Sequence, residues 1–135
     1  MNSVALVSDL MTTNIETISA SDSLQKASDV FNSRHFRHLP VVEEGRLEGI
    51  LSQTDFENVA LGLRLANKTS KEKSNLLERI KVAEVMTSDV YSVTPQTSAE
   101  QVMKVFREEK FHAMPVVDEG EVVGIISHHD VFYYI

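Results

Sequence analysis

Two stretches of sequence decide the fold, and each occurs twice. Leu39-Pro40-Val41-Val42-Glu43-Glu44-Gly45 returns as Met114-Pro115-Val116-Val117-Asp118-Glu119-Gly120, and Gly49-Ile50-Leu51-Ser52-Gln53-Thr54-Asp55 returns as Gly124-Ile125-Ile126-Ser127-His128-His129-Asp130. Working outward, residues 7–60 align with 82–135 without a gap, and 16 of the 54 positions are identical. Ordinary composition gives roughly three or four such matches. Because so short a unit cannot bury its own apolar face, we expect the two copies to pack around one shared core.

Each copy carries the pattern of a strand, a helix, two strands and a second helix. β-Branched residues predict short strands at 15–18 and 90–93, and apolar residues at helical spacing predict helices over 24–31 and 99–106. Thr97 with Glu100 predicts a capping box at the second helix, and Asp22 with Gln25 a weaker one at the first. The apolar runs 39–42 and 47–51, and 114–117 and 122–126, predict hairpins. The fold class is α/β (α+β).

The segment between the copies is not covered by the repeat. Thr69-Ser70-Lys71-Glu72 has the form of a capping box, and Leu76, Leu77 and Ile80 supply a narrow apolar stripe. This predicts a charged surface helix that connects the copies. We therefore expect a first repeat over 1–66, a helical connector over 67–81 and a second repeat over 82–135.

Composition limits the class of protein. The chain has 135 residues, 42% hydrophobic residues, no cysteine and a net charge of −7. A disulfide framework and a cysteine-ligated metal site are therefore excluded, and the charge disfavours binding to nucleic acid or anionic membranes. No apolar run reaches the roughly 18 to 20 residues that span a bilayer, and the N-terminus has no secretory pattern. We expect a cytoplasmic globular protein.

A hydrophobic-Pro-Val-Val-acidic segment followed by Gly-hydrophobic-hydrophobic-Ser-x-x-Asp, present twice and each time preceded by Met-Thr, resembles the cystathionine β-synthase (CBS) domain family. The resemblance covers about four-fifths of the chain. It implies a tandem pair, or Bateman module, packed as a pseudo-two-fold disc. It also implies adenosine-containing ligands in the clefts between the repeats, and homodimers through the disc faces.

The resemblance also implies which residues bind the ligand. The aspartates, Asp55 and Asp130, would accept hydrogen bonds from the ribose hydroxyls, and the serines, Ser52 and Ser127, would contact phosphate. These roles are physically sound, because one carboxylate can accept from two adjacent hydroxyls, and phosphate suits a hydroxyl beside the free N–H groups of a helix N-terminus. The full candidate set is Arg37, His38, Pro40, Ser52, Thr54, Asp55, His112, Pro115, Ser127 and Asp130. Pro40 and Pro115 are included because a backbone group beside each strand start would contact adenine.

The two copies differ at several of these positions. The first has Arg37, His38 and Thr54, where the second has His112, Ala113 and His129. Arginine binds phosphate more strongly than neutral histidine does, because its guanidinium is charged and can donate two hydrogen bonds at once. We therefore expect the first copy to bind more strongly. Two alternatives stay open: Ser-x-x-Asp also caps a helix, and the basic residues before the strand are also consistent with a solvated surface.

No catalytic constellation is present. The chain has no cysteine nucleophile, no Gly-x-Ser-x-Gly, no Walker-type loop and no His-Glu-x-x-His. His112, His128, His129 and Asp130 do not predict a zinc site, because adjacent histidines at a strand end point apart. We expect no enzyme and no required cofactor.

The favoured function is a non-catalytic regulatory module. It would bind AMP, ADP or ATP, with or without Mg²⁺, and S-adenosylmethionine is an alternative ligand. An unidentified effector protein or a second protomer would respond to the conformational change. The competing function is a ligand-free dimerisation scaffold. The aromatic end of the chain, residues 131–135, would supply its surface unless that end is the buried last helix.

Overall fold

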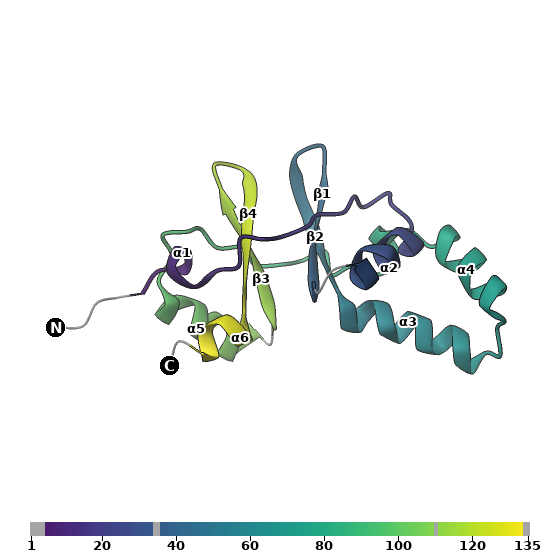
Figure 1. Cartoon of the computed structure of the whole chain (residues 1–135). Helices are drawn as coiled ribbons and strands as arrows, with labels where there is room; N and C mark the ends of the chain where they lie inside the picture. Colours follow the sequence, from purple (N-terminus) through teal and green to yellow (C-terminus); the bar gives the residue numbers. More distant parts are fainter. Residues whose placement is uncertain (1–4, 34–35, 110, 134–135) are drawn as a thin grey trace. The chain divides into compact units, whose positions relative to one another are not determined.

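The computed structural model describes residues 5–33, 36–109 and 111–133, which form two compact units (Figure 1). The first-copy unit lies within residues 16–89, and the second-copy unit within 90–135 together with 1–15. The segment Met11-Thr12, near the start of the first copy, thus belongs to the second-copy unit. In the same way Met86-Thr87 belongs to the first-copy unit. Each hairpin pairs with the Met-Thr segment near the start of the other copy.

The elements confirm the α/β fold class. The first-copy unit contains α2 (Leu24–Ser33), β1 (His38–Glu43), β2 (Arg46–Ser52), α3 (Gln53–Leu65), α4 (Ser70–Arg79) and a 3-10 helix, η1 (Val82–Glu84). The second-copy unit contains α1 (Val7–Leu10), α5 (Ala99–Glu109), β3 (Ala113–Asp118), β4 (Glu121–Ser127) and α6 (His128–Phe132). In the described part of the chain, no helix is both long and apolar enough to cross a membrane.

Both predicted hairpins are confirmed, and they have the same register. Leu39 pairs with Leu51 in the antiparallel β1–β2 hairpin, as Met114 pairs with Ile126 in β3–β4. The turns contain Glu44-Gly45 and Glu119-Gly120, all with positive φ between 50° and 83°. This explains the Gly at the second position, because a residue without a Cβ adopts the left-handed region without strain.

The strands predicted at 15–18 and 90–93 are wrong in extent, because each contributes a single parallel bridge. Ile18 bridges to Val41, and Val93 to Val116. The N–H of Ile18 donates to the carbonyl of Pro40 at 3.1 Å. The chain then turns at once, since Asp22 accepts a hydrogen bond from the backbone of Ser19 at 2.8 Å. The pairing is therefore not extended beyond Ile18.

The prolines also differ from expectation, since Pro40 and Pro115 lie third in their strands rather than at the start. Pro40 is opposite Ile50, whose N–H and C=O both bond to Thr87 on the other side, at 2.9 Å. The position is therefore a non-hydrogen-bonded pair of the hairpin, and the β1–β2 ladder requires no N–H from the proline.

The helix caps were predicted one residue too early. Ser23 accepts from the N–H of Lys26 at 3.2 Å, and Ser98 from that of Gln101 at 3.1 Å. Thr97 instead closes the preceding turn, with its hydroxyl accepting from the backbone N–H of Thr94 at 3.1 Å. A serine directly before the helix takes the cap, because Ncap side chains reach the N3 amide.

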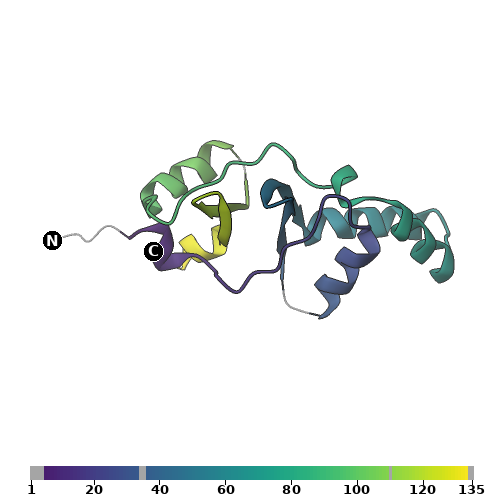
Figure 2. The same ribbon diagram turned by 90° about the horizontal axis from the view of Figure 1, so that it is seen from above.

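The connector helix is confirmed as α4. Thr69 accepts from the N–H of Glu72 at 3.1 Å, and the Glu72 carboxylate accepts from the N–H of Thr69 at 2.9 Å. Leu77 is buried, and Ser74 donates to the side-chain carbonyl of Gln25 at 3.4 Å. Helices α2, α3 and α4 lie side by side (Figures 1 and 2), so α4 packs into the first-copy unit.

Each unit contains its own cluster of buried side chains, and the shared core that we expected stays a prediction. In the first-copy unit the cluster joins Leu39 and Leu51 of the hairpin to α2, Leu77 and Val82. In the second-copy unit, Val7 is buried with the β3–β4 hairpin, α5 and α6. Val82 and Val7 are equivalent positions, and each fills the core of the opposite copy's unit. This exchange supplies the apolar surface that a single repeat lacks.

Candidate functional site

The candidate site of the first copy is built around the junction of β2 and α3. Ser52 is the N-cap of α3, and its hydroxyl oxygen accepts from the N–H of Asp55 at 3.0 Å. The Asp55 carboxylate is half-buried and has no hydrogen bond or ion pair with any residue in the described ranges. A carboxylate in this position can still accept two hydrogen bonds from a ligand.

The amides at this helix start are less free than the sequence predicted. The N–H of Gln53 donates to the carbonyl of Arg37 at 2.8 Å, and that of Asp55 is used by Ser52. Of the N–H groups in the first turn of α3, that of Thr54 has no partner among the described residues. An anion here would therefore rely on one amide, on the hydroxyls of Ser52 and Thr54, and on nearby positive charge rather than on the whole helix terminus.

The start of β1 lies beside this junction. Arg37 is exposed, and its carbonyl accepts a hydrogen bond from the N–H of Gln53. The backbone of Arg37 therefore lies next to the start of α3. His38 is opposite Ser52 in the hairpin register, which puts the two side chains on the same face. His38 is half-buried and already interacts with a neighbour in the folded chain. Pro40 is fully buried, and its carbonyl accepts from Ile18.

The second copy uses the same motif differently. Ser127 accepts from the N–H of Asp130 at 3.2 Å, and Asp130 accepts in return from the N–H of Ser127 at 3.0 Å. The hydroxyl of Thr12 lies 3.5 Å from the other carboxylate oxygen of Asp130. Asp130 is therefore the return partner of a complete capping box, whereas Asp55 is not.

The remaining second-copy candidates lie around the start of α6. His112 is exposed, its carbonyl accepts from the N–H of His128 at 3.0 Å, and the two rings are 5.2 Å apart. His129 packs on Tyr133 with ring centroids 4.4 Å apart. Pro115 is fully buried. Within the described ranges, no group of three or more potential ligands is arranged to hold a metal ion.

The structure thus brings Arg37, Ser52, Thr54 and Asp55 together at one junction. The sequence reasoning missed Thr12 as a neighbour of Asp130. Its signal was available, because Met11-Thr12 is part of the repeat. The repeat alone does not identify Thr12 as a neighbour of Asp130, because no nearby residue in the sequence indicates that this segment bridges to Ile125 of the other copy.

The model of the family described as CBS domain matches residues 7–62 and 82–135, so both repeats are covered. The chain belongs to the CBS domain family. As a tandem CBS pair it is 28% identical over 93% of its length to the CBS domain-containing protein YhcV of Bacillus subtilis (strain 168), 81% of which it covers. It is 29% identical to homoserine O-acetyltransferase of Methanococcus vannielii, but it spans only 24% of that protein.

Solved CBS structures have the same fold. The crystal structure of CBSX2 in complex with AMP is 26% identical to this CBS pair, with a TM-score of 0.73. The match covers 96% of this chain and 95% of that one. The fold class expected from the repeat is therefore confirmed.

Proposed function

We propose that this CBS pair is a non-catalytic regulatory module that binds an adenine nucleotide, AMP, ADP or ATP, through its first copy. The observation that carries the proposal is the Asp55 carboxylate, which has no partner among the described residues and lies at the same helix start as Ser52 and Thr54. The AMP complex of the similar CBSX2 supports this class of ligand. In this proposal no cofactor is required, Mg²⁺ accompanies only the longer phosphate chains, and S-adenosylmethionine is the alternative ligand.

The roles follow from the chemistry of the junction. Asp55 accepts from the two ribose hydroxyls by charge-assisted hydrogen bonds, each worth about 1.5 to 3 kcal/mol. Ser52 still has a hydroxyl proton to donate, although its oxygen caps α3. Arg37 carries a charge that offsets the net charge of −7, which otherwise repels phosphate.

The second copy is the weaker site in this proposal. Asp130 would have to share its carboxylate between the ribose and the backbone of Ser127. His112 replaces Arg37 and offers a single donor when neutral. Ser127, His112 and Pro115 therefore remain candidates for a second, weaker ligand, with the same adenosine chemistry.

Calorimetric titration tests the proposal directly, with AMP, ADP, ATP with and without Mg²⁺, and S-adenosylmethionine. Asp55→Ala should weaken binding at least about tenfold to a hundredfold, since each lost ribose hydrogen bond is worth about 1.5 to 3 kcal/mol. Asp130→Ala is the matched control and should change the affinity of the stronger site little. A ligand at about 100 times its dissociation constant should also add roughly 2.7 kcal/mol of stability. Absence of binding by every ligand would overturn the proposal.

A second candidate function is association between chains, as a cytoplasmic scaffold for a homodimer or an effector protein. Phe132 and Tyr133 favour it, because 71% and 73% of their surfaces are exposed. Neighbouring exposed aromatic side chains are common at interaction sites. Light scattering with and without nucleotide tests the homodimer: constitutive association supports it, and a monomer under both conditions contradicts it.

A further inference from the structure

The segment between the two copies carries a charge opposite to that of the rest of the chain. Residues 61–81 contain six of the 13 lysines and arginines but only two of the 20 aspartates and glutamates, a net charge of +4 in a chain of −7. The rest of the chain therefore carries −11. Because this segment lies between the repeated residues, the duplication does not account for its charge.

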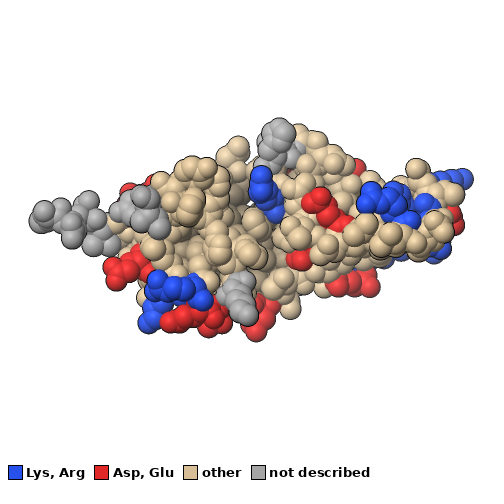
Figure 3. Space-filling model, turned by 90° about the horizontal axis from the view of Figure 1, so that it is seen from below, with Lys and Arg blue, Asp and Glu red and all other residues tan. Residues whose placement is uncertain are grey.

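Several of these cations are exposed where α3 and α4 meet. Arg64 lies in the last turn of α3, Lys68 in the loop that follows, and Lys71 in the first turn of α4. None of the three forms an ion pair with a carboxylate in the described part of the chain. Viewed from below, basic side chains gather over the end of the first-copy unit where these two helices lie (Figure 3). Their charge is therefore open to a partner.

The loop between the helices holds these cations in place. Asn67 adopts the left-handed conformation, with a φ of 59°, and the N–H of Lys68 bonds back to the carbonyl of Leu63 at 3.3 Å. This is the usual way to end a helix tightly. Thr69 then caps α4. Lys68 is thus fixed beside the last turn of α3 rather than carried on a loose linker.

Two exposed leucines accompany the cations on α3. Leu61 is 41% exposed and Leu65 is 73% exposed, and their spacing of four residues puts them on the same side of the helix. Leu63 packs against the core of the first-copy unit, so the two exposed leucines lie on the outward side. We call the set Leu61, Arg64, Leu65, Lys68 and Lys71 the α3–α4 surface.

We propose that the α3–α4 surface binds an acidic amphipathic helix of a partner protein. Leu61 and Leu65 form a ridge one helical turn long, which packs into the groove of a second helix. Carboxylates beside the apolar stripe of that helix pair with Arg64, Lys68 and Lys71. The proposal rests on the regulatory role proposed above, to which it adds the place where the effector protein binds. Nucleotide and partner then contact opposite ends of α3, since Asp55 lies in its first turn.

A short acidic helix suits this surface better than an extended polyanion does. A membrane or a nucleic acid duplex would also meet the faces that carry −11, which repel it, whereas one helix contacts the basic end alone. Phosphate groups would leave the two leucines exposed to water. The surface also lacks the tryptophan and tyrosine side chains that are typical of membrane-interface segments.

Fluorescence anisotropy with a labelled synthetic peptide tests the proposal. The probe is an acidic amphipathic peptide that has leucines four residues apart and glutamates beside them, and its counterpart has glutamine at each glutamate. The wild type should bind the acidic probe about tenfold or more tightly than its counterpart, and added salt should weaken this binding.

Two double variants separate the charged contacts from the apolar ones. Arg64→Glu with Lys68→Glu should weaken binding about tenfold or more, because repulsion replaces attraction at two positions. Leu61→Gln with Leu65→Gln should weaken binding by a similar factor but leave its salt dependence unchanged. All four positions are exposed, so thermal unfolding should show folded variants.

The matched control changes the net charge equally at exposed positions outside the surface. Arg46→Glu with Lys104→Glu should bind the acidic probe as the wild type does. An equal loss in this control would overturn the proposal, because net charge alone would then explain the binding. Failure of the wild type to bind the acidic probe at low salt would also overturn it.

Other occupants are outcomes of the same experiment. Vesicles of phosphatidylcholine and phosphatidylserine, or a DNA duplex, might replace the peptide as the tighter ligand of this surface, and either result would overturn the proposal. Sedimentation equilibrium in which Arg64→Glu with Lys68→Glu abolishes self-association would assign the surface to a second copy instead. Calorimetric titration with AMP keeps the two proposals apart: AMP binding without peptide binding overturns only the partner surface.

Discussion

The backbone of Gly49 lies directly against the backbone of Thr87. A Cβ at Gly49 would be 2.4 Å from the Thr87 carbonyl oxygen, and one at Gly124 would be 2.8 Å from that of Thr12. Both contacts flank a pair of hydrogen bonds, between Ile50 and Thr87 and between Ile125 and Thr12. The glycine of the repeated motif is therefore required for the approach of the Met-Thr segment to the hairpin.

Gly49→Ala should lower the free energy of unfolding by about 1 to 3 kcal/mol, the range for overpacking against structure that cannot yield. The obstacle is backbone rather than a flexible side chain, so the bridge between Ile50 and Thr87 has to open. Gly124→Ala should lower it less, because its contact is longer. Urea denaturation followed by circular dichroism measures both.

Gly62→Ala is the matched control. Gly62 lies within α3, and a Cβ there meets nothing within 4 Å. Replacing a helical glycine by alanine should add about 0.5 to 1 kcal/mol of stability. If all three substitutions had similar effects, the contact with the Met-Thr segment would not be the reason for the motif glycine.

A second prediction concerns the two aspartates in the ligand-free protein. Asp130→Ala removes the return bond of the capping box to Ser127 and should lower the free energy of unfolding by about 0.5 to 2 kcal/mol. Asp55→Ala should lower it less, because the Asp55 carboxylate has no partner among the described residues. Thermal unfolding of protein freed of nucleotide tests this. Equal losses would mean that Asp55 is also a structural cap.

Local signals predicted most of the fold. The hairpins follow from a polar, Gly-containing turn between apolar runs, and α4 from its own capping box of Thr69 and Glu72. Such features depend on residues close in sequence. The caps at Ser23 and Ser98 were missed by one residue, because serine, threonine and aspartate all cap well and neighbouring candidates compete.

Long-range contacts could not be predicted in this way. The exchange of the Met-Thr segments between the two hairpins depends on residues far apart, such as Thr12 and Ile125. The difference between Asp55 and Asp130 was also invisible, since the Ser-x-x-Asp motif is identical in both copies. It becomes visible only when the hydrogen-bond partners of each carboxylate are known.

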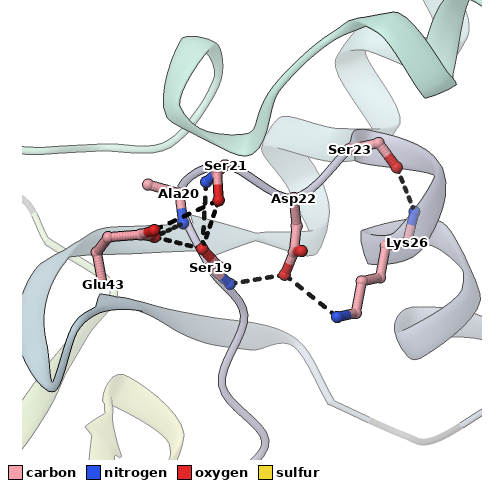
Figure 4. A network of polar contacts seen from close by, with 7 residues as sticks. All are labelled: Ser19, Ala20, Ser21, Asp22, Ser23, Lys26 and Glu43. Atoms are coloured by element: carbon pink, nitrogen blue, oxygen red, sulfur yellow. Dashed lines mark hydrogen bonds and ion pairs between the residues drawn. The ribbon is translucent and has the colours of Figure 1, made fainter.

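The third prediction concerns the acid stability of the turn before α2. Glu43 accepts hydrogen bonds from the hydroxyl of Ser19, from the N–H of Ala20 at 3.1 Å and from the hydroxyl of Ser21 at 3.3 Å (Figure 4). The bond from Ser19 is the main reason why the pKa of Glu43 is below its usual value. Desolvation is the next-largest effect and opposes it, and the bonds from Ala20 and Ser21 add smaller contributions that lower the pKa. All three bonds favour the charged carboxylate.

The sign of the pH dependence follows from this lowered pKa. The folded protein binds the Glu43 proton less readily than the unfolded chain does, so the stabilisation is fully present above the ordinary glutamate pKa of about 4.3. It is lost as the pH falls through the lower pKa of the folded state. Glu43→Gln cannot ionise, so its free energy of unfolding should fall less steeply than that of the wild type below about pH 4.3.

Urea denaturation at a series of pH values between about 3 and 7 measures this difference, over the range where carboxylates titrate. Asp118→Asn is the matched control, because Asp118 is the equivalent residue of the second copy, is exposed, and accepts no side-chain hydrogen bond from the residues described. Glu72, whose pKa is also lowered by its bond from the N–H of Thr69, is retained in every variant and contributes equally to each profile. The slopes of the wild-type and Glu43→Gln profiles should therefore differ only on the acid side, where the wild type loses the stability that ionised Glu43 provides. Parallel profiles would show that Ser19 and its neighbours do not stabilise the ionised Glu43.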